Sequence, residues 1–204
     1  TAKAIELSER YDTQVFILHV STKEEMELIR KAKNSELLVY AEVTPHHLFL
    51  TEEDYARWGT KVQMNPPLRT KKDQEALWEA IHDGTADTIG SDHAPHLLEE
   101  KKLPYGQAPS GVPGIETTLP LLLNAYHDKK IGLDQIVDLT RVNIENIFNL
   151  EPTSDVVLVD LEKTQQVQDS LLKTKCGWSP FSGRTLKGWP IYTILKGNIF
   201  PCSM

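Results

Sequence analysis

One short stretch of the chain holds an acidic residue and two histidines within five positions: Asp92, His93 and His96. It follows an apolar run, residues 86–89, that predicts a buried strand, and it leads into a long loop rich in Gly and Pro. In parallel α/β proteins, functional sites are built at the carboxyl ends of the strands. Residues 90–96 are therefore the candidate site around which the other elements are placed.

Polar side chains also end three other predicted strands. The strands are residues 15–20, 37–43 and 62–65, and the polar side chains are His19, His46, His47 and Asn65. Because parallel strands end at one edge of a sheet, we expect these side chains to converge on a pocket with Asp92. Imidazole and carboxylate are ligands that suit zinc and its first-row neighbours. The pattern therefore indicates a metal site.

Helices are predicted between these strands. Ser21 and Glu24 form a capping box that opens one helix, and Thr70 caps another that ends at Gly84. Alternation of strand and helix is typical of βα units and a parallel sheet, so we expect an α/β fold. After the loop of residues 97–114 the pattern becomes helical, with helices expected over 115–126 and 133–140 and a further one capped by Asn143.

The composition changes again near residues 150–155. Two β-like runs follow, separated by loops that contain Trp178 and Trp189, which we interpret as packing residues. We expect one region over residues 1–152 and a small β-rich subdomain over residues 153–204. The β-like runs are residues 156–159 and 191–195.

Bulk properties exclude several classes of partner. The 204 residues are 40% hydrophobic and carry a formal net charge of −7, which argues against nucleic acid or an anionic membrane as the main partner. No apolar run approaches the ~20 residues needed to span a bilayer. The two cysteines, Cys176 and Cys202, have no metal-ligand spacing, so we expect a reducing cytoplasm.

Six blocks of the chain come in the order and spacing of the dihydroorotase family of the amidohydrolase superfamily, which the chain therefore resembles. The blocks are residues 18–21 (LHVS), 41–48 (AEVTPHHL), 65–69 (NPPLR), 90–96 (GSDHAPH), 111–117 (GVPGIET) and 178–184 (WSPFSGR). The resemblance implies a (β/α)₈ barrel with one or two zinc ions at its carboxyl face. It also implies reversible cyclisation of N-carbamoyl-L-aspartate to L-dihydroorotate, a step of pyrimidine biosynthesis.

The resemblance also implies roles for particular residues. His19 and Asp92 would bind metal, and Asp92 would act as the general acid/base that gives a proton to the leaving amide nitrogen. A bound metal lowers the pKa of water toward ~7, and a ligand carboxylate beside it is placed for proton transfer. The residues that would hold the small-molecule substrate are Asn65, His96, Pro109, Ser110 and Gly111.

Other polar residues of these blocks have simpler interpretations. His93 follows Asp92 directly, so its side chain is expected to point elsewhere and to be structural. His46 and His47 are expected to shape their loop, with Glu42 as a supporting carboxylate.

The family's site is incomplete in this chain. It needs a His-x-His pair, a bridging carboxylated lysine or aspartate and one more histidine, yet His19 is the first histidine present. Four barrel strands are predicted where eight are required. We therefore expect the C-terminal half of the barrel plus the small β subdomain, a view that the start at Thr1 within a helical pattern also favours. The expected partner is the N-terminal half, without which the chain would be inactive; a homodimer is an open alternative.

Two other functions compete with dihydroorotase. An allantoinase or hydantoinase also opens cyclic amides, but the second histidine of the Asp92–His96 motif resembles dihydroorotase. A non-catalytic dihydroorotase-like scaffold is the alternative from another class, and the presence of His19 and Asp92 weakens it.

Overall fold

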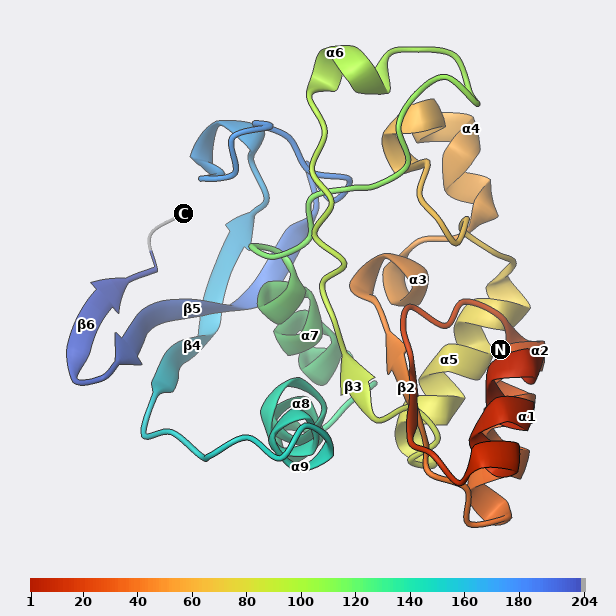
Figure 1. Ribbon diagram of the computed structural model, residues 1–204. Helices are drawn as coiled ribbons and strands as arrows, with labels where there is room; N and C mark the ends of the chain where they lie inside the picture. The colour runs from red at the N-terminus through yellow and green to blue at the C-terminus, as the bar shows by residue number, and fades with distance from the viewer. Residues whose placement is uncertain (203–204) are drawn as a thin grey trace.

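The computed structural model describes residues 1–202 and shows a mixed α/β fold with two three-stranded sheets (Figure 1). The first sheet is parallel, in the order β1-β2-β3, and the second is antiparallel, in the order β4-β5-β6. The mixed α/β class is confirmed. The strands are β1 (Val15–Ile17), β2 (Val39–Val43), β3 (Thr88–Ile89), β4 (Val156–Gln166), β5 (Thr185–Leu195) and β6 (Asn198–Pro201).

Nine α-helices are found in residues 1–202, and in Figure 1 α1, α2 and α5 lie to one side of β3 and α7, α8 and α9 to the other. They are α1 (Ala2–Tyr11), α2 (Lys23–Asn34), α3 (Pro45–Phe49), α4 (Tyr55–Trp58), α5 (Lys71–His82), α6 (Leu98–Lys101), α7 (Thr118–His127), α8 (Leu133–Val137) and α9 (Asn143–Ile147). Short 3₁₀ turns are η1 (Glu52–Asp54), η2 (Gly59–Val62) and η4 (Asp169–Leu171), and η3 (Asp138–Val142) is a π-helical turn. No helix among these residues combines the length and apolar character that crossing a lipid bilayer requires.

Strand β2 shows how the main core is built. Val39, Ala41 and Val43 point to one face and are buried against residues of α2, α5, α7 and α8, whereas Tyr40 and Glu42 point to the other face and are half-buried. This two-residue alternation follows from strand geometry. It leaves Glu42 on the open face, at the carboxyl end of the strand.

Strand β1 differs from the prediction of a strand buried on both faces. It spans only Val15–Ile17, and all three residues are half-buried because β1 pairs with β2 on one side only. The backbone then leaves the extended conformation, and His19 has a φ of 40°. His19 therefore lies just beyond the strand rather than within it.

The predicted strand over residues 62–65 is wrong. Residues 59–62 form the turn η2, and the backbone carbonyl of Gln63 accepts hydrogen bonds from Gly111 N (3.0 Å) and Lys101 Nζ (2.8 Å). Because these partners come from the loop of residues 97–114, the segment is held by that loop and joins no sheet. In residues 1–202 the parallel sheet has three strands, one fewer than predicted.

Helix caps are partly as predicted. Thr70 caps α5, since its hydroxyl accepts from Asp73 N and donates to Asp73 Oδ2. At α2 the N-cap is Thr22 and not Ser21, because the Thr22 hydroxyl accepts from the backbone N–H of Glu25 (3.2 Å). Asn143 is the first residue of α9 and not its N-cap, because the π-helical turn η3 continues directly into α9.

A second core joins the C-terminal sheet to the loops near β3. The buried Trp178 and Trp189 share this cluster with Leu50, Val62 and Val112. Trp178 therefore packs against the parallel half of the molecule as well, which extends the interpretation of it as a packing residue of the β subdomain.

A candidate site at the carboxyl ends of the parallel strands

His19 and Asp92 share an unusual backbone conformation. Their φ angles are 40° and 42°, in the left-handed region that residues other than glycine rarely adopt. Each lies a few residues beyond a parallel strand, β1 for His19 and β3 for Asp92. Such strain persists where the surrounding structure enforces it, and it concentrates at functional sites. The two residues predicted to bind metal are therefore both held in this conformation beyond parallel strands; five other non-glycine residues elsewhere in the described chain also adopt it.

The pKa of Glu42 is affected by both His19 and Asp92. Burial raises the pKa of its carboxyl group and the negative charge of Asp92 adds to the rise, while the backbone and charge of His19 oppose it. The Glu42 carboxylate also fills the space beside Gly90, where any Cβ atom would overlap it. The three strand ends thus bring His19, Glu42 and Asp92 into one cluster.

His46, in helix α3, faces the same cluster from below the surface. Its side chain is 2% exposed, and its Nε2 atom lies 3.8 Å from Asp92 Oδ2. Burial, with smaller contributions from the neighbouring His47 and His19 rings, lowers the pKa of His46 well below its usual value, which favours the neutral ring. Within the described residues Nε2 has no hydrogen-bond partner. A buried polar atom in this state is unusual in a folded protein and indicates a bound ion, water or ligand at this place.

His47 has a structural role. Its Nδ1 pairs with the Thr44 hydroxyl at 2.8 Å and its Nε2 with the backbone carbonyl of Pro66 at 3.0 Å. Burial lowers the pKa of His47 to about 4, so the ring stays neutral. The residue ties α3 to the Asn65-Pro66 segment, where the peptide bond is cis. This agrees with the interpretation of His47 as a loop-shaping residue.

The predicted substrate residues fall into two groups. His96 Nε2 pairs with the carbonyl of Ser110 at 3.1 Å, and Gly111 packs so closely on Ala94 that a Cβ atom there would lie 2.6 Å from the Ala94 carbonyl oxygen. The structure therefore brings His96 together with the loop of residues 109–111. Asn65 is exposed, on the neighbouring segment that Gln63 joins to this loop.

His93 is turned away from this group, as the sequence indicates. Its Nδ1 accepts hydrogen bonds from the backbone N–H groups of Gly114 (3.1 Å) and Ile115 (3.3 Å). The ring therefore holds the loop that leads to α7.

The donors present suit zinc but do not complete a zinc site. Imidazole from His19 and carboxylate from Asp92 are zinc ligands by type, and the unpartnered His46 Nε2 beside Asp92 is consistent with a ligand at this place. Across residues 1–202, however, no three His, Cys, Asp or Glu side chains form a group that could hold a metal ion. Protein zinc sites use three or four protein ligands, so residues 1–202 do not by themselves show a complete zinc site.

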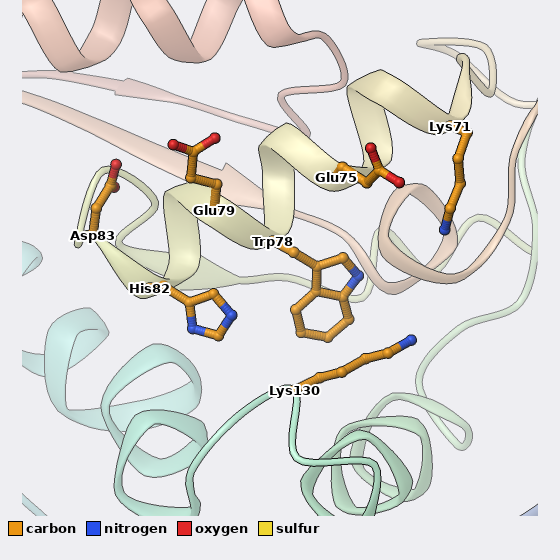
Figure 2. A pocket seen from close by; sticks show the side chains of 7 residues that line it. All are labelled: Lys71, Glu75, Trp78, Glu79, His82, Asp83 and Lys130. Carbon is orange, nitrogen blue, oxygen red and sulfur yellow. The ribbon is translucent and has the colours of Figure 1, made fainter.

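A wide pocket lies elsewhere, on the outer side of α5 (Figure 2). Trp78 lies at its centre, with its indole Nε1 donating to the Leu48 carbonyl, and the Lys130 ammonium is 5.9 Å from the ring centroid. The lining residues are Lys71, Glu75, Trp78, Glu79, His82, Asp83 and Lys130. None of the residues clustered around Asp92 lines it, so this pocket is separate from the candidate site.

Two residues near the site escape reasoning from sequence. The Lys101 side chain is buried and binds three backbone carbonyls, although it lies in a run of charged residues that predicts an exposed helix face. Trp178 donates from Nε1 to the carbonyl of His96 at 2.8 Å, across 82 positions of sequence. Neither contact has a local sequence signal, because each depends on how distant loops fold together.

Solved structures with this fold define its class. An L-hydantoinase (dihydropyrimidinase) from Arthrobacter aurescens superimposes with a TM-score of 0.92 at 28% identity, over 97% of this chain and 47% of that one. The inactive dihydroorotase-like domain of a Chaetomium thermophilum CAD-like multifunctional protein gives a TM-score of 0.78 at 27% identity, over 97% of this chain and 54% of that one. The chain thus has the fold of part of an amidohydrolase-superfamily protein.

Sequence comparison narrows the class further. Dihydroorotases from Bacillus cereus and Anoxybacillus flavithermus are each 40% identical to this chain over 97% of its length. The chain is therefore a homologue of the dihydroorotases, as its motifs indicate, and it spans about half (48%) the length of these relatives. No family model matches the chain.

Proposed function

We propose that this chain forms the C-terminal half of a dihydroorotase barrel and provides part of its active site. The parallel sheet supports this, because β1 and β3 each have one unpaired edge in residues 1–202 and a barrel closes such edges with further strands. The 48% coverage of the curated relatives supports it as well. In this proposal residues 1–152 belong to the barrel, and residues 153–204 form the small β-rich subdomain.

The proposed reaction is the reversible cyclisation of N-carbamoyl-L-aspartate to L-dihydroorotate. The observation that carries it is the convergence of His19, Glu42 and Asp92 at the ends of three parallel strands, with His46 of α3 lying 3.8 Å from Asp92. His19 and Asp92 would hold zinc, which when bound polarises the scissile carbonyl and acidifies water. One or two ions would occupy the complete site.

Asp92 is the proposed proton carrier. In ring opening its carboxylate takes a proton from the water that attacks the carbonyl carbon and gives it to the departing amide nitrogen as the C–N bond breaks; in cyclisation the amide nitrogen loses the proton to Asp92, which returns it to the departing water. The buried neighbour of this carboxylate is the neutral His46 ring, whose Nε2 atom lies 3.8 Å from Asp92 Oδ2.

Substrate would lie over the groups that meet at the mouth of this cluster. His96 and the backbone of Pro109, Ser110 and Gly111 form one side, and Asn65 lies on the adjoining segment. A cytosolic location is part of the proposal, and the free thiols of Cys176 and Cys202 support it.

A hydantoinase-type cyclic amidohydrolase is the second candidate, supported by the TM-score of 0.92 with the L-hydantoinase. The 40% identity with dihydroorotases, against 28% with that hydantoinase, favours dihydroorotate as the substrate. A non-catalytic scaffold is supported by the similarity to the inactive dihydroorotase-like domain. The assay below separates the three.

The test uses what we call the complete assembly: this chain together with the polypeptide that corresponds to the uncovered half of its relatives. We expect it to bind zinc and to hydrolyse L-dihydroorotate in preference to hydantoin or allantoin. Asp92→Asn should lower turnover by about 10³-fold or more while zinc content falls less, because the amide cannot take up the proton. Asp134→Asn, at an exposed position, is the matched control.

Three results would contradict the proposal. Preferred hydrolysis of hydantoin would favour the second candidate, and an assembly without zinc or turnover would favour the scaffold. Near-normal turnover by Asp92→Asn would remove the assigned role of that residue.

A further inference from the structure

Lys101, the last residue of α6, is one of the largest fully buried side chains of the molecule. It is 1% exposed, although its neighbours Glu100 and Lys102 are exposed. Its Nζ atom lies 2.8 Å from the carbonyl oxygen of Gln63, 2.8 Å from that of Pro109 and 3.0 Å from that of Gly111. An ammonium group has three N–H donors, so all of them are used by these hydrogen bonds.

The charge of Lys101 is not neutralised by a carboxylate. Among the ion pairs of residues 1–202 none includes Lys101, and its only polar side-chain partners are the three carbonyls. Burying an ammonium costs free energy, so such a residue is rare unless its hydrogen bonds are complete. Burial lowers the pKa of Lys101 to about 8, which still leaves most of it charged at neutral pH.

The three carbonyls belong to the two segments that the proposed function assigns to substrate. Pro109 and Gly111 flank Ser110, whose own carbonyl binds His96, and Gln63 lies two residues before Asn65. The Gln63 side chain makes a second connection by donating to the carbonyl of Ala108 at 2.7 Å. Lys101 is therefore the common anchor of both segments.

The backbone of Lys101 is anchored in turn. The Thr60 hydroxyl, in the turn η2, donates to the Lys101 carbonyl. The end of α6 is thus fixed to the segment that leads to Gln63, so the ammonium is held at a defined position relative to the carbonyls.

We propose that Lys101 is a positioning residue: its buried ammonium sets the loop of residues 109–111 against the Asn65 segment and so shapes the substrate cradle. The proposal rests on the proposed function. Lys101 contacts no atom that reacts, and it acts through the backbone of the residues it holds.

The test compares Lys101→Met with Lys102→Met in the complete assembly. Methionine retains most of the side-chain volume but removes all three donors, so we expect KM for L-dihydroorotate to rise about tenfold or more, kcat to change less than about threefold and zinc content to stay the same. Lys102→Met, at an exposed position paired with Glu99, should leave both constants within about twofold of wild type.

A separate variant keeps the proposal testable if Lys101→Met does not fold. Lys101→Gln keeps two N–H donors without the charge, and we expect KM to rise about threefold or more. An unchanged KM in a folded Lys101 variant would overturn the positioning role. A rise in KM matched by equally large falls in kcat and zinc content would overturn it as well.

If the proposed function is wrong, the wild-type assembly will not hydrolyse L-dihydroorotate, and this result separates that failure from a failure of the Lys101 proposal. In that case Lys101 is tested by hydrogen exchange of the Gly111 amide, which donates to Gln63 O. Faster exchange in the variant than in Lys102→Met would support the anchor, and equal exchange would refute it.

Discussion

The parallel sheet β1–β3 and the antiparallel sheet β4–β6 differ in which side chains lie at their strand ends and in how far their faces are buried. The parallel sheet buries one face of β2 under helices and directs polar side chains from its strand ends into the Asp92 cluster. The antiparallel sheet contains none of the candidate site residues and exposes apolar side chains such as Val157, Ile199 and Phe200.

The two regions therefore have different roles: one carries the candidate site residues, and the other holds them in place by packing. The parallel sheet places reactive groups, because its strands all end at one edge. The C-terminal region acts on the site through packing: Trp178 fills the second core and its indole binds the carbonyl of His96. The following predictions test how far this division holds.

Replacing Trp178 is expected to have the largest effect on stability. Trp178 and Trp189 are both 1% exposed, so either substitution by alanine should reduce the free energy of unfolding by about 3–5 kcal/mol in urea denaturation. Only Trp178 binds the site loop, since Trp189 Nε1 donates to Leu186 O. Trp178→Ala should therefore also raise KM in the complete assembly, whereas Trp189→Ala should not. An equal KM in the two variants would show that the C-terminal region does not support the site.

Gly90→Ala tests the close packing of the strand ends. Its Cβ atom would overlap the Glu42 carboxylate, so we expect a loss of about 1–3 kcal/mol in urea denaturation and lower zinc content and turnover. Gly132→Ala is the control, because a Cβ atom there would lie 3.6 Å from Gln135 Oε1, an ordinary contact. If Gly90→Ala matched this control, the Glu42 carboxylate would be free to move.

The smallest expected effect is at the Thr70 cap of α5. Thr70→Ala removes the capping hydroxyl and should cost about 1 kcal/mol at pH 7 with turnover unchanged. Thr164→Ala, at an exposed position of β4, should change stability by less than about 0.5 kcal/mol.

The Thr70 effect should also depend on pH. Burial opposes ionisation of Asp73, but hydrogen bonds from the Thr70 hydroxyl and from the backbone of Lys23 and Thr70 outweigh it and lower the pKa of the carboxyl group. A lowered folded-state pKa stabilises the fold above the unfolded value of 3.8, and this contribution is lost as pH falls through the folded value. The stability difference between wild type and Thr70→Ala should therefore stay the same well above pH 3.8 and shrink as pH falls below 3.8. A stability difference that does not change with pH would show that the Thr70 cap does not depend on ionisation of the Asp73 carboxyl group.

Sequence patterns predict the parallel half well where the signal is local. The Thr70 box, the apolar strands and the turn residues act over a few positions, and the structure retains them. The segment of residues 62–65 misled the prediction because its apolar residues are buried in the second core, against distant segments, and not within the parallel sheet. Burial alone does not specify the partner that causes it.

The sequence by itself determined the class of the fold, the kinship with dihydroorotases and the positions of His19 and Asp92 at strand ends, because motif order and strand–helix alternation are written along the chain. Only the tertiary structure decided that His46, rather than His47, faces Asp92 and that Lys101 anchors the loop of residues 109–111. The physical reason is that the contacts of His46 with Asp92 and of Lys101 with Gln63 join segments far apart in sequence. Their formation depends on how loops satisfy buried polar groups, which no local pattern encodes.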